Sequence, residues 1–179
     1  MVFAHLVRRR RGERAAHVIP DRGRGLAANL LAMSFDRDPD PAAVRALEAS
    51  LILHAEQGFN ASTFAARTVA STGASLPGAL TGGLAALAGA RHGGAEEDVW
   101  RMLVDIDDPA AAEGWVAAQL DAGRRIPGFG HRVFRRRDPR HAPMRAALDR
   151  LASARGDRRL VALHDAVVDA VGARRPLAP

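Results

Sequence analysis

Apolar residues recur along most of the chain every three or four positions, the spacing that gives an α-helix one apolar face. Short segments rich in proline, glycine and aspartate separate these stretches, and such residues interrupt helices. No stretch of useful length alternates apolar and polar residues as a half-buried strand does. The pattern therefore predicts an all-α protein without internal repeats.

The expected helices follow one another with short connections. An N-terminal helix ends in an arginine run, and residues 20–25 form a connector of proline, glycine, aspartate and arginine. Further helices are predicted at about 26–33, 41–57, 61–72, 78–90, 96–105, 109–122, 143–154 and 160–171.

Several helix boundaries carry residues that favour them. Asp40 followed by Pro41 is typical of a helix start, since the carboxylate accepts from free backbone N–H groups and proline suits the first helical position. Asn60, Ser62 or Thr63 can cap the helix that follows. The glycine at position 172 is expected to end the last helix.

Two of the expected helices have unusual apolar surfaces. The stretch 47–53 is apolar on several faces, which predicts a helix buried in the core or in a dimer interface. The stretch 78–90 is rich in glycine and alanine, and small residues let another helix backbone approach closely. That run is too short and too weakly apolar to span a membrane, so we expect close packing in a soluble helical core.

The most constrained stretch runs from Pro127 to Arg140. Gly128 and Gly130 permit backbone angles and a close ligand approach that a Cβ forbids, and they flank Phe129 just before a histidine. Asp138-Pro139 is expected to turn or cap the chain ahead of Arg140. A basic surface loop is the simpler alternative, but a solvated loop has no need of this glycine pair, so we interpret the stretch as an anion-binding site.

Composition narrows the chemistry. The chain contains no cysteine, which excludes disulfides and thiolate catalysis, and no metal site is expected. Every basic residue other than histidine is arginine, and the net charge of +6 favours phosphates, carboxylates or nucleic acid as ligands. Aromatic residues make up only 4%, too few for the stacking platforms of single-strand readers, so no nucleic-acid partner is expected. No apolar run has the length of a membrane span, and we expect a cytoplasmic protein without a membrane partner.

Three segments together resemble the citrate synthase family, which includes 2-methylcitrate synthases. The first is Gly128-Phe129-Gly130-His131-Arg132-Val133-Phe134-Arg135 with Asp138-Pro139-Arg140. The others are His54-Ala55-Glu56-Gln57-Gly58-Phe59-Asn60-Ala61-Ser62-Thr63-Phe64 and His92-Gly93-Gly94-Ala95, in the family's order. The resemblance runs the length of the chain. It implies a helical fold with part of a large domain at 1–92 and most of a small domain at 93–179.

The resemblance also implies an activity, the condensation of acetyl-CoA with oxaloacetate to citrate and CoA. His92 matches the donor to the acetyl-CoA carbonyl, and His131 matches the residue that polarises the oxaloacetate ketone. Arg140 matches an arginine that pairs with an oxaloacetate carboxylate, and a planar guanidinium suits that task.

Other residues match the family's ligand-binding positions. Arg135 is placed near the CoA phosphates, and the loop of Pro127, Gly128, Phe129 and Gly130 would lie along the CoA. No cofactor is implied, because coenzyme A enters as a thioester substrate. Family members are dimers, so a homodimer is expected.

Three departures from the family pattern concern the site. Gln57 stands where many members have a further oxaloacetate-binding histidine, a role that His54 can partly take. Glu96 adds a negative charge where members often have asparagine. In the family, the catalytic aspartate follows a Pro-Asn-Val stretch that comes after a Leu-x-Pro. The given sequence matches the Leu-x-Pro at Leu177-Ala178-Pro179, its last residues. We therefore expect a fragment that lacks this base and much of the N-terminal large domain, with impaired activity.

Three alternatives stay open at this point. The acyl pocket is not identifiable, so propionyl-CoA, the substrate of a 2-methylcitrate synthase, is as compatible as acetyl-CoA. The chain can also be an inactive remnant that binds CoA or dimerises. A basic RNA-binding helical protein ranks last, for want of stacking aromatic residues. For His92 a structural role is also open, because a lone histidine at a helix end more often caps that helix than binds a ligand.

Overall fold

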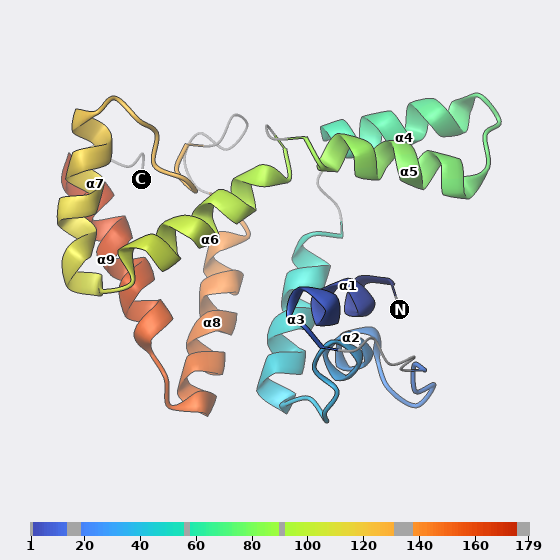
Figure 1. Cartoon of the computed structure of the whole chain (residues 1–179), viewed down its shortest axis with the longest axis horizontal. Coiled ribbons are helices and arrows are strands. Elements are labelled where there is room, and N and C mark those ends of the chain that lie inside the picture. Colours follow the sequence, from blue (N-terminus) through green and yellow to red (C-terminus); the bar gives the residue numbers. More distant parts are fainter. Residues whose placement is uncertain (1, 14–18, 56–57, 90–91, 131–137, 175–179) are drawn as a thin grey trace. The chain divides into compact units, whose positions relative to one another are not determined.

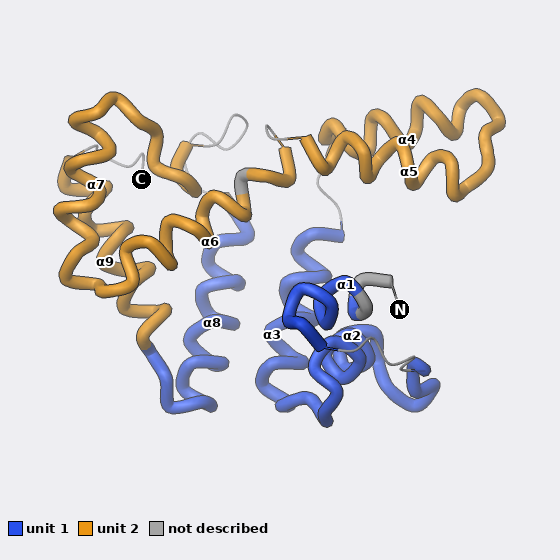
Figure 2. The backbone as a smooth tube through the Cα atoms, in the orientation of Figure 1, with its two compact units in different colours: residues 1–55, 139–158 blue, residues 56–138, 159–179 orange. Residues whose placement is uncertain are grey.

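The computed structural model describes residues 2–13, 19–55, 58–89, 92–130 and 138–174, and every regular element among them is helical (Figure 1). The prediction of an all-α protein is thus confirmed for these residues. The chain folds into two compact units, residues 1–55 with 139–158 and residues 56–138 with 159–179 (Figure 2). The domain boundary expected at residue 92 stays a prediction.

The described residues of unit 1 form four helices. These are α1 (Val2–Arg10), α2 (Leu26–Phe35), α3 (Pro41–Leu53) and α8 (His141–Arg155). In chain order, α1 packs on α2, α2 on α3, and α3 on α8. The buried apolar side chains are mostly small, which lets the helix axes come close. They are Ala4, Ala27, Met33, Ala42, Ala147 and Ala152.

An ion pair between a buried arginine and an exposed aspartate ties α1 to the end of α2. Arg8 is only 6% exposed, and its Nη2 donates to Asp36 Oδ2 at 3.1 Å. Asp36 is the C-cap of α2 and lies in the left-handed region at φ 52°. A charge taken out of water needs a partner, so this aspartate fixes where the arginine-rich end of α1 can lie.

Unit 2 begins with a helical hairpin, α4 (Ala61–Ser71) and α5 (Leu76–Leu87), which lie side by side in Figure 1. The glycines of α5 face α4. A Cβ on Gly82 would lie 3.0 Å from Val69 Cγ2, and one on Gly83 would lie 3.3 Å from both Ala66 Cβ and Ser62 O. The predicted close approach at the glycine- and alanine-rich helix is therefore confirmed.

The apolar core of unit 2 lies among α6 (Gly94–Ile106), the 3₁₀ turn η1 (Pro109–Ala111), α7 (Ala112–Asp121) and α9 (Arg159–Arg174). The largest fully buried side chain is Val116 of α7. Around it pack buried residues from α6, α7, the loop after α7, and α9: Met102, Ile106, Ala112, Ile126, Leu163, Val167, Ala170 and Val171. Burial of this apolar surface is what brings α9 back onto α6 and α7.

Side-chain caps set the starts of α3, α4 and α5. Asp40 Oδ1 accepts from the Ala42 N–H at 2.8 Å, with Pro41 in the first position as predicted. Of the three possible caps for α4, Asn60 takes the role and accepts from the Thr63 N–H at 2.8 Å. Ser75 caps α5. Each cap satisfies an N–H group that has no partner inside the helix.

Of the two positions expected for the apolar stretch 47–53, the core is wrong for Ile52, which is 73% exposed, and the dimer interface stays a prediction. Two expectations about the helix ends of α3 and α9 were also wrong. Helix α3 ends at Leu53, ahead of the stretch to residue 57 that the apolar pattern suggested. Gly172 does not end the last helix, which continues to Arg174, because packing of α9 against the core outweighs the low helix propensity of one glycine. No helix in the described ranges combines the length and the apolar character needed to cross a bilayer.

The core of unit 2 gives a stability test within one helix. Leu163 of α9 is 2% exposed and Leu160 of the same helix is 48% exposed. Leu163→Ala is expected to lower the free energy of unfolding by about 2–5 kcal/mol, because it leaves a cavity in a packed core. Leu160→Ala, the matched control, is expected to change it by less than about 1 kcal/mol. Urea unfolding followed by circular dichroism measures both, and equal losses would contradict the assigned core.

Candidate functional site

Three predicted site residues, Gln57, His131 and Arg135, lie outside the described residues. Their roles, including the shared cavity predicted for His92 and His131, stay predictions. The remaining predicted residues are described, and they fall in three places: His92 after α5, the glycine loop before residue 131, and the ends of α3 and α8.

His92 is held by a hydroxyl from another helix. Its Nε2 lies 2.7 Å from Ser62 Oγ, a hydrogen-bond distance between residues 30 positions apart. Ser62 belongs to the first turn of α4, and His92 follows the end of α5, so the hairpin brings the two together. The imidazole is half-buried. This histidine is thus more than a cap of its own helix.

The backbone around His92 is also fixed. The His92 N–H donates to Gly89 O at 2.9 Å, and the Gly93 N–H donates to Leu87 O at 2.9 Å. The second bond reaches back to the last residue of α5 and closes the connection between α5 and α6. Two main-chain bonds and one side-chain bond therefore set the position of the imidazole.

Sequence reasoning did not find Ser62 as a partner of His92. Ser62 was noted only as a possible helix cap, a role that Asn60 fills. No local spacing links a serine to a histidine 30 residues away. The signal in the sequence is indirect: the glycines of α5 indicate a close helical partner, and that partner begins at the Ser62 turn.

The glycine loop has the backbone that its sequence predicted. Gly128 and Gly130 have φ values of 84° and 80°, in the left-handed region that favours glycine. A Cβ at Gly128 would lie 3.1 Å from Val99 Cγ2, whereas Gly130 has open space. Phe129 is half-buried and packs against the core of unit 2, so its ring anchors the loop. Its predicted contact with CoA stays a prediction.

Unit 1 places the two other described site residues at one end of a helix pair. Arg155 at the end of α8 pairs with Asp40 at the start of α3 (3.6 Å), so the packed helices are antiparallel. His54, the C-cap of α3, and Arg140, the N-cap of α8, therefore lie at the opposite end. His54 is exposed and its Nδ1 lies 2.7 Å from Ser50 O, so it is not a core histidine.

Two ion pairs stabilise α8 on the C-terminal side of Arg140. Asp149 Oδ2 accepts from Arg145 Nε and its Oδ1 from Arg158 Nη2, both at 2.9 Å. The hydrogen bond from Arg145, followed by that from Arg158, lowers the pKa of the Asp149 carboxyl below its usual range. The carboxylate thus stays charged at neutral pH and links α8 to the segment that follows it.

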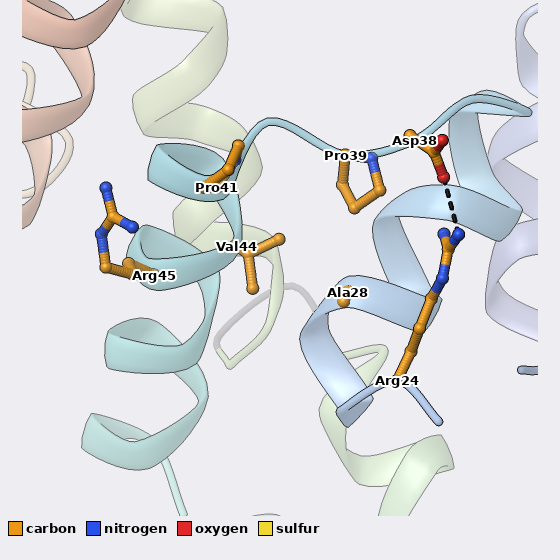
Figure 3. Close-up of a pocket in the computed structure, with 7 residues that line it drawn as sticks. All are labelled: Arg24, Ala28, Asp38, Pro39, Pro41, Val44 and Arg45. Atoms are coloured by element: carbon orange, nitrogen blue, oxygen red, sulfur yellow. Dashed lines mark hydrogen bonds and ion pairs between the residues drawn. The ribbon is translucent and has the colours of Figure 1, made fainter. Parts of the chain in front are cut away.

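A surface pocket of about 490 Å³ lies between α2 and α3 and contains none of the predicted site residues (Figure 3). Pro39, Pro41, Ala28 and Val44 provide apolar walls. On one side Arg24 Nη2 donates to Asp38 Oδ1 at 2.7 Å, and this bond raises the pKa of the arginine. Within the described part of the chain, no group of three or more histidine, aspartate or glutamate side chains is placed to hold a metal ion.

Comparison with known proteins adds to this geometry. The family model described as citrate synthase, C-terminal domain, matches residues 1–179. The 2-methylcitrate synthase of Mycobacterium tuberculosis is 47% identical over 153 residues, which cover 86% of this chain and 38% of that protein. The citrate synthase of Mycolicibacterium smegmatis is 38% identical over 178 residues, which cover 99% of this chain and 47% of that protein.

A solved structure gives the same picture. The citrate synthase of Thermoplasma acidophilum, determined as a ternary complex with carboxymethyl coenzyme A and oxaloacetate, superposes with a TM-score of 0.81 at 28% identity. The match covers 97% of this chain and 46% of that one. The chain spans less than half the length of these relatives.

The Ser62–His92 contact gives a prediction that does not depend on turnover. Ser62→Ala removes the hydroxyl at His92 Nε2, so the ring nitrogen is expected to react faster with diethylpyrocarbonate, by about tenfold if the bond is worth about 1.4 kcal/mol. Peptide mapping by mass spectrometry reports the modification at each histidine. Ser71→Ala is the matched control, because that hydroxyl donates to Thr68 O within the same helix. Unchanged reactivity of His92 in Ser62→Ala would contradict the contact.

Proposed function

The chain belongs to the citrate synthase family, and on this premise we propose that it carries substrate-binding and catalytic residues of an acyltransferase that condenses acetyl-CoA with oxaloacetate. The observation that supports this most directly is His92, held at Nε2 by Ser62 beside glycine backbone. A fixed, half-buried imidazole is suited to donating a hydrogen bond to a developing enolate oxygen.

The chemistry assigns one nitrogen of His92 to the substrate. A neutral imidazole carries one N–H, so a Ser62 hydroxyl that donates to Nε2 leaves the proton on Nδ1. Nδ1–H then donates to the thioester carbonyl while a base removes a methyl proton, and the charge that develops on that oxygen is stabilised. The tautomer is therefore set by a residue that does not touch the substrate.

The next steps use the other predicted residues. The enolate carbon attacks the oxaloacetate ketone, a C–C bond forms, and His131 donates to the ketone oxygen as it becomes an alkoxide. Arg140 pairs with an oxaloacetate carboxylate, with His54 and Gln57 as further donors. Water then cleaves the C–S bond of citryl-CoA, which gives citrate and the free thiol. Coenzyme A takes part as a thioester substrate, and these reaction steps need no redox cofactor.

The Thermoplasma structure supports the choice of ligands. That relative was solved with a CoA derivative and oxaloacetate together. In this chain, the loop from Pro127 to Gly130 contains two left-handed glycines, and Arg135 follows it in the sequence. We propose that the loop lies along the CoA, with Arg135 near its phosphates.

A second acyl substrate is favoured by a specific observation. The Mycobacterium tuberculosis relative, at 47% identity, is named a 2-methylcitrate synthase. Propionyl-CoA differs from acetyl-CoA by one methylene, which an apolar pocket distinguishes by about 10- to 200-fold. The 2-methylcitrate reaction is therefore the alternative, followed by a remnant that binds CoA or dimerises without turnover.

A homodimer is also part of the proposal. The outer face of α5 presents leucines that are each more than 40% exposed: Leu76, Leu80, Leu84 and Leu87. Ile52 is also exposed, and it lies in the stretch 47–53, for which a dimer interface was one of the two expected positions. Apolar surface of this kind is stabilised by contact with a partner, and a second copy of the chain is the partner we propose.

Thiol release tests the activity. The assay uses acetyl-CoA or propionyl-CoA with oxaloacetate, on this chain and on a version extended through the Asn-Val-Asp that the family has after Leu177-Ala178-Pro179. We expect oxaloacetate-dependent thiol release from the extended version, and about 100- to 10,000-fold less from a chain without the base. The acyl-CoA with the higher kcat/KM identifies the reaction. No thiol release from the extended version with either substrate would contradict the enzymatic proposal.

Arg140 tests the oxaloacetate site. Arg140→Ala is expected to raise the KM for oxaloacetate by about 10- to 100-fold, because a charge-assisted hydrogen bond to a carboxylate is worth about 1.5–3 kcal/mol. Arg140→Lys keeps the charge but not the planar fork, so it should recover only part of the loss. Arg150→Ala, at an exposed position of the same helix, is the control. An unchanged KM in Arg140→Ala would contradict the role.

The leucine face tests the dimer. Leu80→Asp with Leu84→Asp is expected to halve the molar mass found by size-exclusion chromatography with light scattering, because two buried charges disfavour the contact. Leu160→Asp, on a half-exposed position of α9, is expected to leave the mass unchanged. A monomeric wild-type chain would contradict the proposed interface.

A further inference from the structure

Gly93 has less room for a side chain than any other glycine of the described chain. A Cβ built on it would lie 2.4 Å from Leu87 O, and 3.2 and 3.3 Å from Leu87 Cδ1 and Cγ. Its φ is −69°, so the restriction comes from space and not from backbone angles. Gly94, the next residue, has no atom within 4 Å of the same test position.

The atom that excludes a side chain at Gly93 is also its hydrogen-bond partner. The Gly93 N–H donates to Leu87 O at 2.9 Å, so the backbone of Gly93 lies in direct contact with the C-terminal end of α5. Leu87 is the last residue of α5, whose glycines pack against α4. The carbonyl therefore cannot retreat without disturbing either the helix end or the hairpin.

His92 lies directly before this contact. A methyl group at position 93 would have to move about 1 Å to reach an ordinary van der Waals distance from Leu87 O. The displacement falls on the backbone that carries the imidazole, whose Nε2 is only 2.7 Å from Ser62 Oγ. A shift of that size is enough to break the hydrogen bond.

We infer that Gly93 is a positioning residue. Because it has no side chain, its N–H can donate to Leu87 O, and this bond holds His92 within hydrogen-bond distance of Ser62. The role of this placement in catalysis rests on the proposed function. Gly93 itself touches no substrate and acts only through His92. Loss of this placement is expected to lower kcat by about 100-fold, as other 1 Å misplacements of reacting groups do.

The experiment compares Gly93→Ala with Gly94→Ala in the whole chain. The first readout is the ¹⁵N spectrum of the histidine rings, assigned with His92→Gln, which reports the hydrogen bond at Nε2 without any turnover. We expect the His92 signal to move in Gly93→Ala to the position that it has in Ser62→Ala, and to stay unchanged in Gly94→Ala. A Gly93→Ala spectrum identical to wild type would overturn the inference.

The second readout is kinetic, in the version extended through the aspartate. Gly93→Ala is expected to lower kcat about 100-fold with little change in the KM for oxaloacetate, and combining it with Ser62→Ala should cost less than the product of the two separate losses. Fully multiplicative losses would overturn the inference. So would loss of the helical circular dichroism in Gly93→Ala, because the effect is assigned to the loop alone. If the extended version without any substitution releases no thiol with either acyl-CoA, the proposed function fails, and the ring spectra still decide the role of Gly93.

Discussion

The close approach of α5 to α4 is the constraint on which the His92 site depends. An added Cβ would lie only 3.0 Å from α4 at Gly82 and 3.3 Å from it at Gly83, and Ser62 O is one of the atoms that Gly83 faces. The start of α4 and the end of α5 are thereby brought to the same place. A hydroxyl and an imidazole 30 residues apart meet there because the helices that carry them are packed at backbone distance.

The role proposed for His92 depends on this rigidity. A histidine used as a hydrogen-bond donor must have its proton on one nitrogen and its ring at one angle, and both are set by what the other nitrogen contacts. In this chain the contact is a serine on a helix, and the backbone next to the ring is closed by a main-chain bond to Leu87. Reorganisation during reaction is costly, so a site built on packed helices is better suited to this task than a free loop.

The helices of unit 1 are held together with little burial of apolar surface. Its core consists mainly of alanines, which bury little area, and its helices are held in addition by the pairs Arg8–Asp36 and Asp40–Arg155. The second pair fixes α3 and α8 as antiparallel neighbours, which places His54 and Arg140 at one end of the pair. Apolar faces on α3 and α5 stay exposed in the single chain, and contact with a second copy would cover them in the proposed dimer.

The sequence alone determined the helical class, the cap at Asp40, and the left-handed glycines at 128 and 130, because each depends on a residue and its near neighbours. For α4 it left three possible caps, of which the structure selects Asn60. It also identified the family, since short motifs keep their order and spacing. Only the tertiary structure decided that Ile52 is exposed while Leu163 is buried, and that Ser62 is the partner of His92. Those outcomes depend on which surfaces meet, and apolar periodicity says that a face is apolar but not what covers it.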